Sequence, residues 1–290
     1  MKFRGLMTDS TAMREFMNIT LSLSKFSKEC VMRITNRRVY FIISAEKDAG
    51  PRRPLAWCEL PVSFYFKEYK LVGVNEEYNE IYLEFSTVLL ARSLAILKQN
   101  VKSCIIKLTN KQSPCLTLEM ELDAEEISSQ IVHDVPVEVI SRKYWSNYEE
   151  PRFDDFHVTI QMPSLKSLRP IVERLKNLSN YLTVTANKNG RLTLQIKTTD
   201  VNLSVHFTDL SIQSFAGQLV TSDDDIEDSS NSQISSTIDI KKFLLFLAGL
   251  QINNTRVLCS IVHNKMVKLF IEQQGSLSIQ VFLTETDYKK

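Results

Sequence analysis

The chain has 290 residues and a mass of 33.4 kDa, which suggests roughly two domains of about 100–200 residues each. It is 43% hydrophobic and 24% charged, a composition typical of a folded globular protein. Lys and Arg number 35 against 34 Asp and Glu, so the net charge is only +1. Any attraction to nucleic acid must therefore come from uneven placement of charge.

Several classes of site are excluded by spacing. The seven glycines, at positions 5, 50, 73, 190, 217, 249 and 275, are too far apart for GxGxxG or GxxxxGK[ST], which excludes Rossmann-fingerprint and P-loop nucleotide sites. Five scattered cysteines form no CxxC pair, and none of the four histidines begins an HExxH motif. We expect reduced thiols, no metal site and no cofactor. The longest apolar run is Phe243–Leu250, and no signal peptide is apparent, so we expect a soluble intracellular protein without membrane contact.

Apolar residues recur at spacings of three and four in four segments, which predicts four helices. In chain order the predicted helices are Ser10–Glu29, Ser86–Gln99, Ser164–Leu178 and Asp239–Gln251. Each begins beside a Ser or Asp whose side-chain oxygen can accept a hydrogen bond from a free backbone N–H of the first turn.

The spacing of these helices indicates an internal repeat. Ser10 and Ser86 are 76 residues apart, and so are Ser164 and Ile240. The two halves are therefore offset by about 154 residues. The strands follow the same offset, because a turn between two predicted strands follows the first helix of each half: Val31–Thr35 with Val39–Ile43, and Leu182–Ala186 with Leu192–Lys197.

Most of the remaining chain alternates polar and apolar residues, which predicts half-buried antiparallel strands. Few helices and many strands give an α+β protein with a duplicated domain, each copy having two helices backed by antiparallel sheet. We expect an N-terminal domain at 1–140, a linker at 141–156 and a C-terminal domain at 157–290. The acidic run Asp223–Asp228 is interpreted as a disordered loop.

Positive charge collects on the predicted helices. They contain eleven basic residues against the four acids Glu15, Glu29, Glu173 and Asp239, so they have a charge of +7 and the rest of the chain −6. A basic face of this kind suits contacts to phosphates without base readout. The candidate DNA-facing residues are Arg14, Lys25, Lys28, Arg92, Lys98, Lys166, Arg169, Arg174, Lys176, Lys241 and Lys242.

Two strands are candidates for pairing with neighbouring chains. Pro136 lies in Ile131–Ile140 and cannot donate to a strand ladder, which places that strand at a sheet edge. Val201–Phe207 is the other candidate edge. Long apolar edges are hazardous unless something covers them. The predicted subunit-interface residues are Val135, Val137, Val139, Val201, Leu203, Val205 and Phe207.

Ten short blocks, spread from the first residue to near the C-terminus, resemble the Hus subunit of the DNA-damage checkpoint clamp, which has a fold like that of proliferating-cell nuclear antigen. They are Met1-Lys-Phe-Arg4, Trp57-Cys-Glu-Leu60, Asn79-Glu-Ile-Tyr-Leu-Glu84, Lys107-Leu-Thr-Asn-Lys111, Pro114-Cys-Leu-Thr117, His133-Asp-Val-Pro136, Arg142-Lys-Tyr-Trp145, Val172-Glu-Arg-Leu-Lys-Asn177, Phe246-Leu-Ala-Gly249 and Asn264-Lys-Met-Val267.

This resemblance implies a non-catalytic subunit of a heterotrimeric ring that encircles double-stranded DNA and signals damage to checkpoint and repair proteins. The implied partners are two sister subunits, a checkpoint clamp loader and repair enzymes. The implied location is the nucleus, with a cytoplasmic stage before assembly. By position, the basic helices face the hole and the two edge strands join the subunits.

Two other functions remain open. A replicative homotrimeric clamp shares the fold, and the mass in solution separates it from a heterotrimer subunit. A hydrolase is the other alternative, because His133-Asp134 is an adjacent acid–base pair. Neighbouring residues of a strand point to opposite faces, however, so these two cannot act as one dyad.

Overall fold

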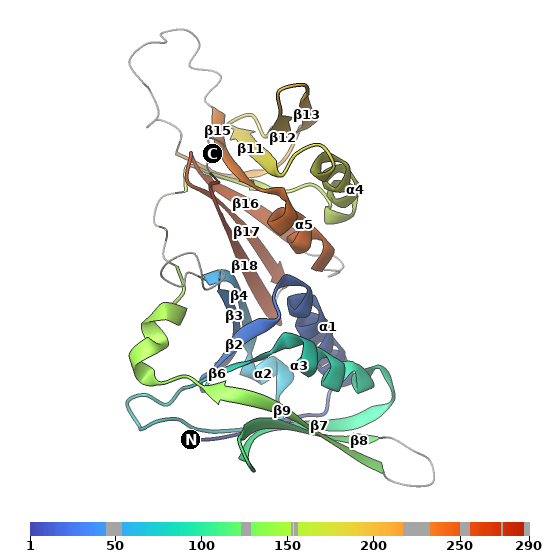
Figure 1. The fold of residues 1–290 in the computed structure, drawn as a ribbon, viewed down its shortest axis with the longest axis vertical. Coiled ribbons are helices and arrows are strands. Elements are labelled where there is room, and N and C mark those ends of the chain that lie inside the picture. The colour runs from blue at the N-terminus through green and yellow to red at the C-terminus, as the bar shows by residue number, and fades with distance from the viewer. Residues whose placement is uncertain are drawn as a thin grey trace. The chain divides into compact units, whose positions relative to one another are not determined.

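The computed structural model describes residues 1–44, 54–122, 129–151, 153, 156–216, 233–249, 256–273 and 275–286. The chain divides into two compact units (Figure 1). Unit 1 contains Met1–Glu150 with Gln273–Ser278, and unit 2 contains Pro151–Glu272 with Ile279–Lys290. The division after Glu150 falls inside the segment 141–156 expected to be a linker. The acidic run Asp223–Asp228 lies outside the described residues.

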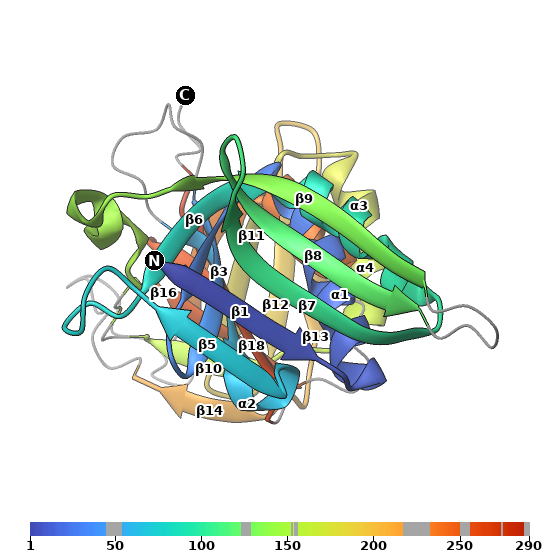
Figure 2. The same cartoon turned by 90° about the horizontal axis from the view of Figure 1, so that it is seen from below.

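Unit 1 is built on antiparallel strands in the order β4-β3-β2-β6-β9-β8-β7-β1-β5. Figure 2 shows β1, β5, β7, β8 and β9 side by side in one curved layer. The strands are β1 (Lys2–Met7), β2 (Glu29–Ile34), β3 (Arg38–Ser44), β4 (Pro54–Pro61), β5 (Glu68–Val72), β6 (Ile81–Ser86), β7 (Val101–Asn110), β8 (Pro114–Leu122) and β9 (Ser129–Val139).

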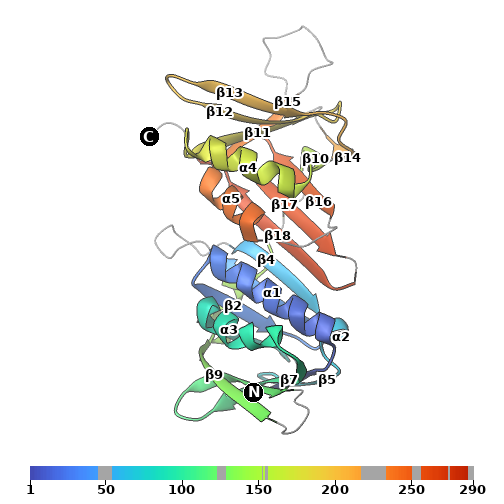
Figure 3. The same ribbon diagram turned by 90° about the vertical axis from the view of Figure 1, so that its right-hand side faces the viewer.

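Two helices of unit 1, α1 (Ser10–Phe26) and α3 (Thr87–Leu94), pack against each other on one side of these strands (Figure 3). The last turn of the predicted second helix is a 3-10 helix, η1 (Ala95–Lys98), because the Gln99 N–H bonds the Ile96 carbonyl three residues back. The short helix α2 (Val62–Tyr65) was not predicted. The core includes Phe16, whose ring centroid lies 5.8 Å from that of Phe41 and 5.9 Å from that of Tyr65.

Unit 2 has two sets of strands, in the orders β14-β10-β16-β17-β18 and β13-β12-β11-β15. Helices α4 (Leu165–Lys176) and α5 (Ile240–Gly249) pack together beside them (Figure 3). The strands are β10 (Val158–Gln161), β11 (Tyr181–Asn187), β12 (Leu192–Lys197), β13 (Asn202–Phe207), β14 (Ile212–Phe215), β15 (Gln233–Asp239), β16 (Arg256–Val262), β17 (Met266–Gln273) and β18 (Leu277–Thr284).

The duplication predicted from the sequence is confirmed by the element order. Apart from α2 and the 3-10 helices, the described residues of each unit run strand, helix, five strands, helix, three strands. The neighbour order corresponds as well, because β4-β3-β2-β6 matches β13-β12-β11-β15, and β9-β8-β7-β1-β5 matches β18-β17-β16-β10-β14. The α+β class and the four predicted helices are confirmed with it.

Part of the expected linker is an ordered piece of unit 1. Residues Arg142–Tyr148 form a second 3-10 helix, η2, in which Trp145 and Tyr148 are buried. The Trp145 ring stacks on Tyr82 with centroids 4.5 Å apart, and its indole N–H donates to the Ile140 carbonyl at 3.0 Å. These contacts attach η2 to β6.

Candidate nucleic-acid interface and subunit edges

Helix α1 buries its apolar face and exposes a basic one. Its N-terminus is capped by Asp9, whose carboxylate accepts the Ala12 N–H at 2.7 Å. Arg14 and Lys25 are exposed on the helix, and Lys28 is exposed just beyond it. The acid of this helix, Glu15, accepts a hydrogen bond from the Tyr65 hydroxyl at 2.9 Å. Burial, together with the Glu15 charge, raises the pKa of Tyr65 well above its usual range. Glu15 is thus drawn toward α2.

The remaining helices have the same exposed basic character. Arg92 on α3 and Lys98 on η1 are exposed, and Ser86 caps α3 by accepting the Leu89 N–H at 3.4 Å. In unit 2, Asp239 caps α5 through the N–H groups of Lys241 and Lys242. All eleven predicted DNA-facing residues are exposed: Arg14, Lys25, Lys28, Arg92, Lys98, Lys166, Arg169, Arg174, Lys176, Lys241 and Lys242.

Basic residues of the helices and of the strands differ in their partners. Arg169 forms an ion pair with Glu173 one turn later at 2.9 Å. Within the described ranges, the other ten helix-associated cations have no ion-pair partner. In unit 1, six cations on strands and their turns form ion pairs across 2.5–3.0 Å, whereas Lys2, Arg37 and Lys70 have none among the described residues; the pairs are Arg4–Glu68, Arg33–Glu80, Arg38–Glu59, Lys102–Glu121, Lys107–Glu119 and Lys111–Asp134. Most of the helix cations are therefore unneutralised by acids of the described chain.

Strand β13 is an edge strand, as predicted for Val201–Phe207. It pairs with β12 from Asn202 to Phe207 and has no neighbour on its other side among the described residues. Its side chains alternate, with Leu203, Val205 and Phe207 half-buried and the intervening residues exposed. Val201, just before the strand, is also exposed.

The edge assignment of Ile131–Ile140 needs two corrections. Residues Ser129–Pro136 of β9 pair with β8, whereas Val137–Val139 pair with β6, so the strand changes partner at Val137 and is not one continuous edge. In addition, Val135 and Val137 are 1% and 8% exposed and belong to the core of unit 1, while Val139 is half-buried. Val132 is the large hydrophobic side chain of this segment that is exposed, at 48%.

The adjacent His133 and Asp134 do not form a dyad. Asp134 instead accepts hydrogen bonds from Lys111 and Thr117, both at 2.5 Å, and these contacts lower the pKa of its carboxyl. In the part of the chain that the structure describes, no group of three His, Cys, Asp or Glu side chains could hold a metal ion. Among the same residues, no helix has the length and apolar character needed to cross a membrane.

The family is decided by comparison with known proteins. A family model described as Hus1-like protein matches residues 1–287. The human "Checkpoint protein HUS1" is 39% identical over 98% of this chain and 99% of the relative. The Drosophila melanogaster "Checkpoint protein Hus1-like" is 30% identical and covers 98% of each chain. The chain belongs to the Hus1-like family.

Solved structures agree on the fold of this Hus1-like chain. Proliferating cellular nuclear antigen from Entamoeba histolytica aligns with a TM-score of 0.69 at 12% identity, over 98% of this chain and 99% of that one. The corresponding antigen from Thermococcus kodakaraensis aligns with a TM-score of 0.65 at 15% identity and the same coverage. Family and fold together identify a subunit of the DNA-damage checkpoint clamp. The predicted resemblance and the duplicated clamp fold are confirmed.

Proposed function

We propose that this chain is a non-catalytic subunit of a heterotrimeric ring that encircles double-stranded DNA and signals damage to checkpoint and repair proteins. Two sister subunits complete the ring, a checkpoint clamp loader places it on DNA, and repair enzymes dock on it. The ring acts in the nucleus, and the subunit is cytoplasmic before assembly.

The observation that carries this proposal is the set of exposed, unpaired cations on the helices of both units. Ten exposed cations on or beside α1, α3, η1, α4 and α5 have no ion-pair partner among the described residues, whereas six cations on strands and turns of unit 1 are neutralised by neighbouring acids. Isolated cations on a regular helical surface suit a polyanion that is contacted through its phosphates. No base-reading arrangement is required, because a ring must move along any sequence.

Assembly relies on the two open strand edges. Among the described residues, one side of β13 and one side of Ser129–Pro136 in β9 have no paired strand, and these sides offer backbone groups to a neighbouring chain. A subunit joined at both edges to different partners makes two different contacts, so self-closure has no reason to be favourable. We therefore expect the purified chain alone to have the mass of one chain, 33.4 kDa.

The test asks whether the assembled ring is topologically linked to circular DNA. The chain is co-expressed with the two sister subunits of its organism, loaded by the clamp loader onto nicked circular DNA, and washed at high salt. Retention on the circle with release after linearisation supports an encircling ring. Equal retention on circular and linear DNA would contradict encirclement. A stable homotrimer of the chain alone would instead favour the replicative clamp.

A further inference from the structure

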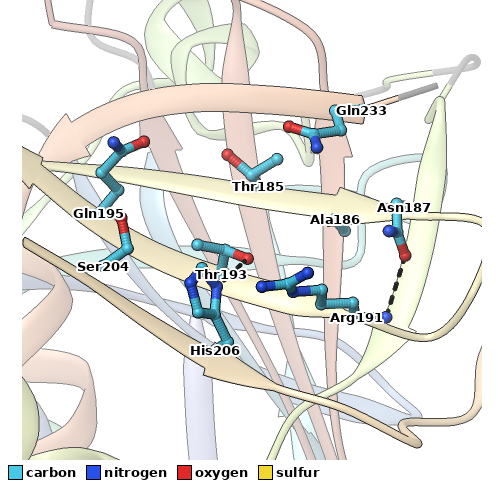
Figure 4. Close-up of a pocket in the computed structure, with 9 residues that line it drawn as sticks. All are labelled: Thr185, Ala186, Asn187, Arg191, Thr193, Gln195, Ser204, His206 and Gln233. Atoms are coloured by element: carbon cyan, nitrogen blue, oxygen red, sulfur yellow. Dashed lines mark hydrogen bonds between the residues drawn. The ribbon is translucent and has the colours of Figure 1, made fainter. Parts of the chain in front are cut away.

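The sheet β13-β12-β11-β15 has polar side chains on the outward side of its central strands. Buried residues such as Val184 and Leu194 alternate with outward-facing ones, and α4 and α5 lie on the other side of this sheet (Figure 3). A pocket of about 170 Å³ lies on the outward side (Figure 4), more than ten times the roughly 10–15 Å³ that a single water needs. It is lined by Thr185, Ala186, Asn187, Arg191, Thr193, Gln195, Ser204, His206 and Gln233.

The hairpin between β11 and β12 fixes the backbone of Arg191, and the Arg191 side chain takes no part in holding the hairpin. The Asn187 carboxamide oxygen accepts the backbone N–H groups of Asn189 and Arg191 at 3.0 and 3.1 Å. Gly190 adopts a φ of 74°, and its carbonyl accepts the Leu210 N–H at 3.0 Å. A Cβ at position 190 would lie 2.4 Å from the Leu210 carbonyl oxygen, so the turn requires glycine. The guanidinium is left to lie over the sheet, toward Thr193 and His206 (Figure 4).

The pocket contains donors and no carboxylate. Arg191 has no hydrogen-bond or ion-pair partner for its side chain within the described residues. Thr193 Oγ1 lies 3.1 Å from His206 Nδ1, which leaves Nε2 of His206 facing no partner among those residues. The hydroxyls of Thr185 and Ser204 and the amide of Gln233 complete the lining. Such a set suits an anion, because a planar guanidinium binds two oxygens of a phosphoryl group at once.

We propose that this pocket binds a phosphoryl group carried by a phosphorylated segment of a partner protein. Three phosphoryl oxygens match the Arg191 fork, the His206 ring and the neighbouring hydroxyls better than the two oxygens of a carboxylate do. This inference does not depend on DNA encirclement, because it concerns the sheet surface that α4 and α5 leave uncovered.

Duplex DNA is the less suitable occupant. Duplex DNA has one negative charge for about every 1.7 Å of its axis, so a surface that binds it needs a row of cations. The pocket has one guanidinium and one imidazole, and its lining includes no Phe, Tyr or Trp ring. A single phosphorylated residue in an extended peptide has the right amount of charge.

The test uses the full chain labelled with nitrogen-15 and three probes. These are a seven-residue Gly/Ser peptide with one central phosphothreonine, the same peptide without phosphate, and inorganic phosphate. We expect the phosphopeptide to shift the Arg191 side-chain and His206 ring signals saturably, and to bind more tightly than inorganic phosphate. The unphosphorylated peptide is expected to leave these signals in place.

Matched variants decide whether the pocket is responsible. Arg191→Gln is expected to weaken phosphopeptide binding about tenfold or more, and Arg191→Lys to give an intermediate effect, because lysine keeps the charge but lacks the fork. Lys197→Gln removes a charge from an exposed residue of the same strand outside the pocket lining, and is expected to bind normally. All three variants are first checked for native circular dichroism.

Three outcomes would overturn the proposal. Equal weakening in the Lys197 and Arg191 variants would mean that binding reflects general charge. Equal affinity for phosphopeptide and inorganic phosphate would mean a small-anion site. Stronger shifts of Arg191 and His206 with a short duplex than with the phosphopeptide would make the surface a nucleic-acid contact.

Discussion

The backbone N–H of His263 donates a hydrogen bond to Nδ1 of His157 across 3.1 Å. Nδ1 of His263 in turn accepts the backbone N–H of Ser235 at 3.1 Å. His157 precedes β10, His263 lies in the turn between β16 and β17, and Ser235 is on β15. The His263 imidazole thus connects the two sets of strands in unit 2, and the His157 imidazole binds the turn that contains His263. Each acts as an acceptor, so Nε2 of each ring holds the proton.

Removing the first acceptor is expected to destabilise unit 2. His157→Leu leaves the His263 N–H without its partner, and a part-buried unsatisfied donor costs about 1–3 kcal/mol. His157→Asn is the matched control, because its side-chain oxygen can accept in a similar position. Urea unfolding followed by circular dichroism gives the free energy of unfolding. Hydrogen exchange of the His263 amide reports on its hydrogen bond to His157. Unchanged exchange at 263 in the leucine variant would show that the bond gives no protection.

We expect the basic helix residues to contribute to DNA binding and the ion-paired strand residues not to contribute to it. Replacing Lys166, Arg174 and Lys176 with Gln in the assembled ring is expected to reduce the slope of log K against log salt by about 0.9 for each phosphate that is no longer neutralised. The control replaces Lys102, Lys107 and Lys111, which removes the same charge from ion-paired positions. A control whose slope falls as much as that of the helix variant would contradict the assignment of the helix surface.

Helices and the duplication could be predicted because their signals are local or repeated. A stripe of apolar residues at spacings of three and four buries one helix face whatever the rest of the chain does. α1 and α4 begin at Ser10 and Leu165, and α3 and α5 at Thr87 and Ile240, giving offsets of 155 and 153. These agree with the predicted offset of about 154.

The β9 error has a different cause. Pro136 correctly indicates a place where the strand ladder is incomplete. A missing backbone hydrogen bond, however, does not determine whether the neighbouring side chains point to the core or to solvent. β9 changes its set of neighbours at Val137, where pairing with β6 begins. That change depends on residues more than fifty positions earlier, so no local pattern predicts it. Arg191 could not be singled out either, because alternating Thr and Gln residues are typical of an ordinary solvent-facing strand.

Two substitutions in β9 are expected to separate folding from assembly. Val137→Asp puts a carboxylate into the core of unit 1, where Val137 is opposite Phe85 in the ladder, and is expected to prevent native folding of the isolated chain. Val132→Asp changes an exposed residue of the open part of β9 and is expected to leave the isolated chain folded. Circular dichroism and thermal melting distinguish the two.

The same Val132 variant tests the subunit edge. A carboxylate introduced where a neighbouring strand packs is expected to lower the affinity for one sister subunit by about 100-fold, because burying an unpaired charge costs several kcal/mol. Co-purification with each sister in turn measures this. Normal co-purification with both sisters would remove the first part of β9 from the interface.

The buried thiols are expected to be inert in the native chain. Burial raises the pKa of Cys104 and of Cys259 to about 12, and raises the pKa of Cys30 and Cys58 as well. Only the thiolate reacts with an aromatic disulfide reagent, and at pH 8 a thiol of pKa 12 is ionised to about one part in ten thousand. We expect these four thiols to label only after denaturation, as mapped by mass spectrometry.

The same shifts set an alkaline limit to stability. A cysteine thiol in the unfolded chain ionises near pH 8.5, below the raised pKa of the buried thiol in the folded chain. The buried thiol's contribution to the free energy of unfolding is therefore fully present below that pH. Above it the unfolded state loses protons that the folded state retains, and stability falls until the folded pKa is passed. We therefore expect the urea midpoint to decline from about pH 9 upward while native labelling stays slow. Rapid labelling of Cys104 at pH 8, with native circular dichroism, would show that the β7 thiol is open to solvent.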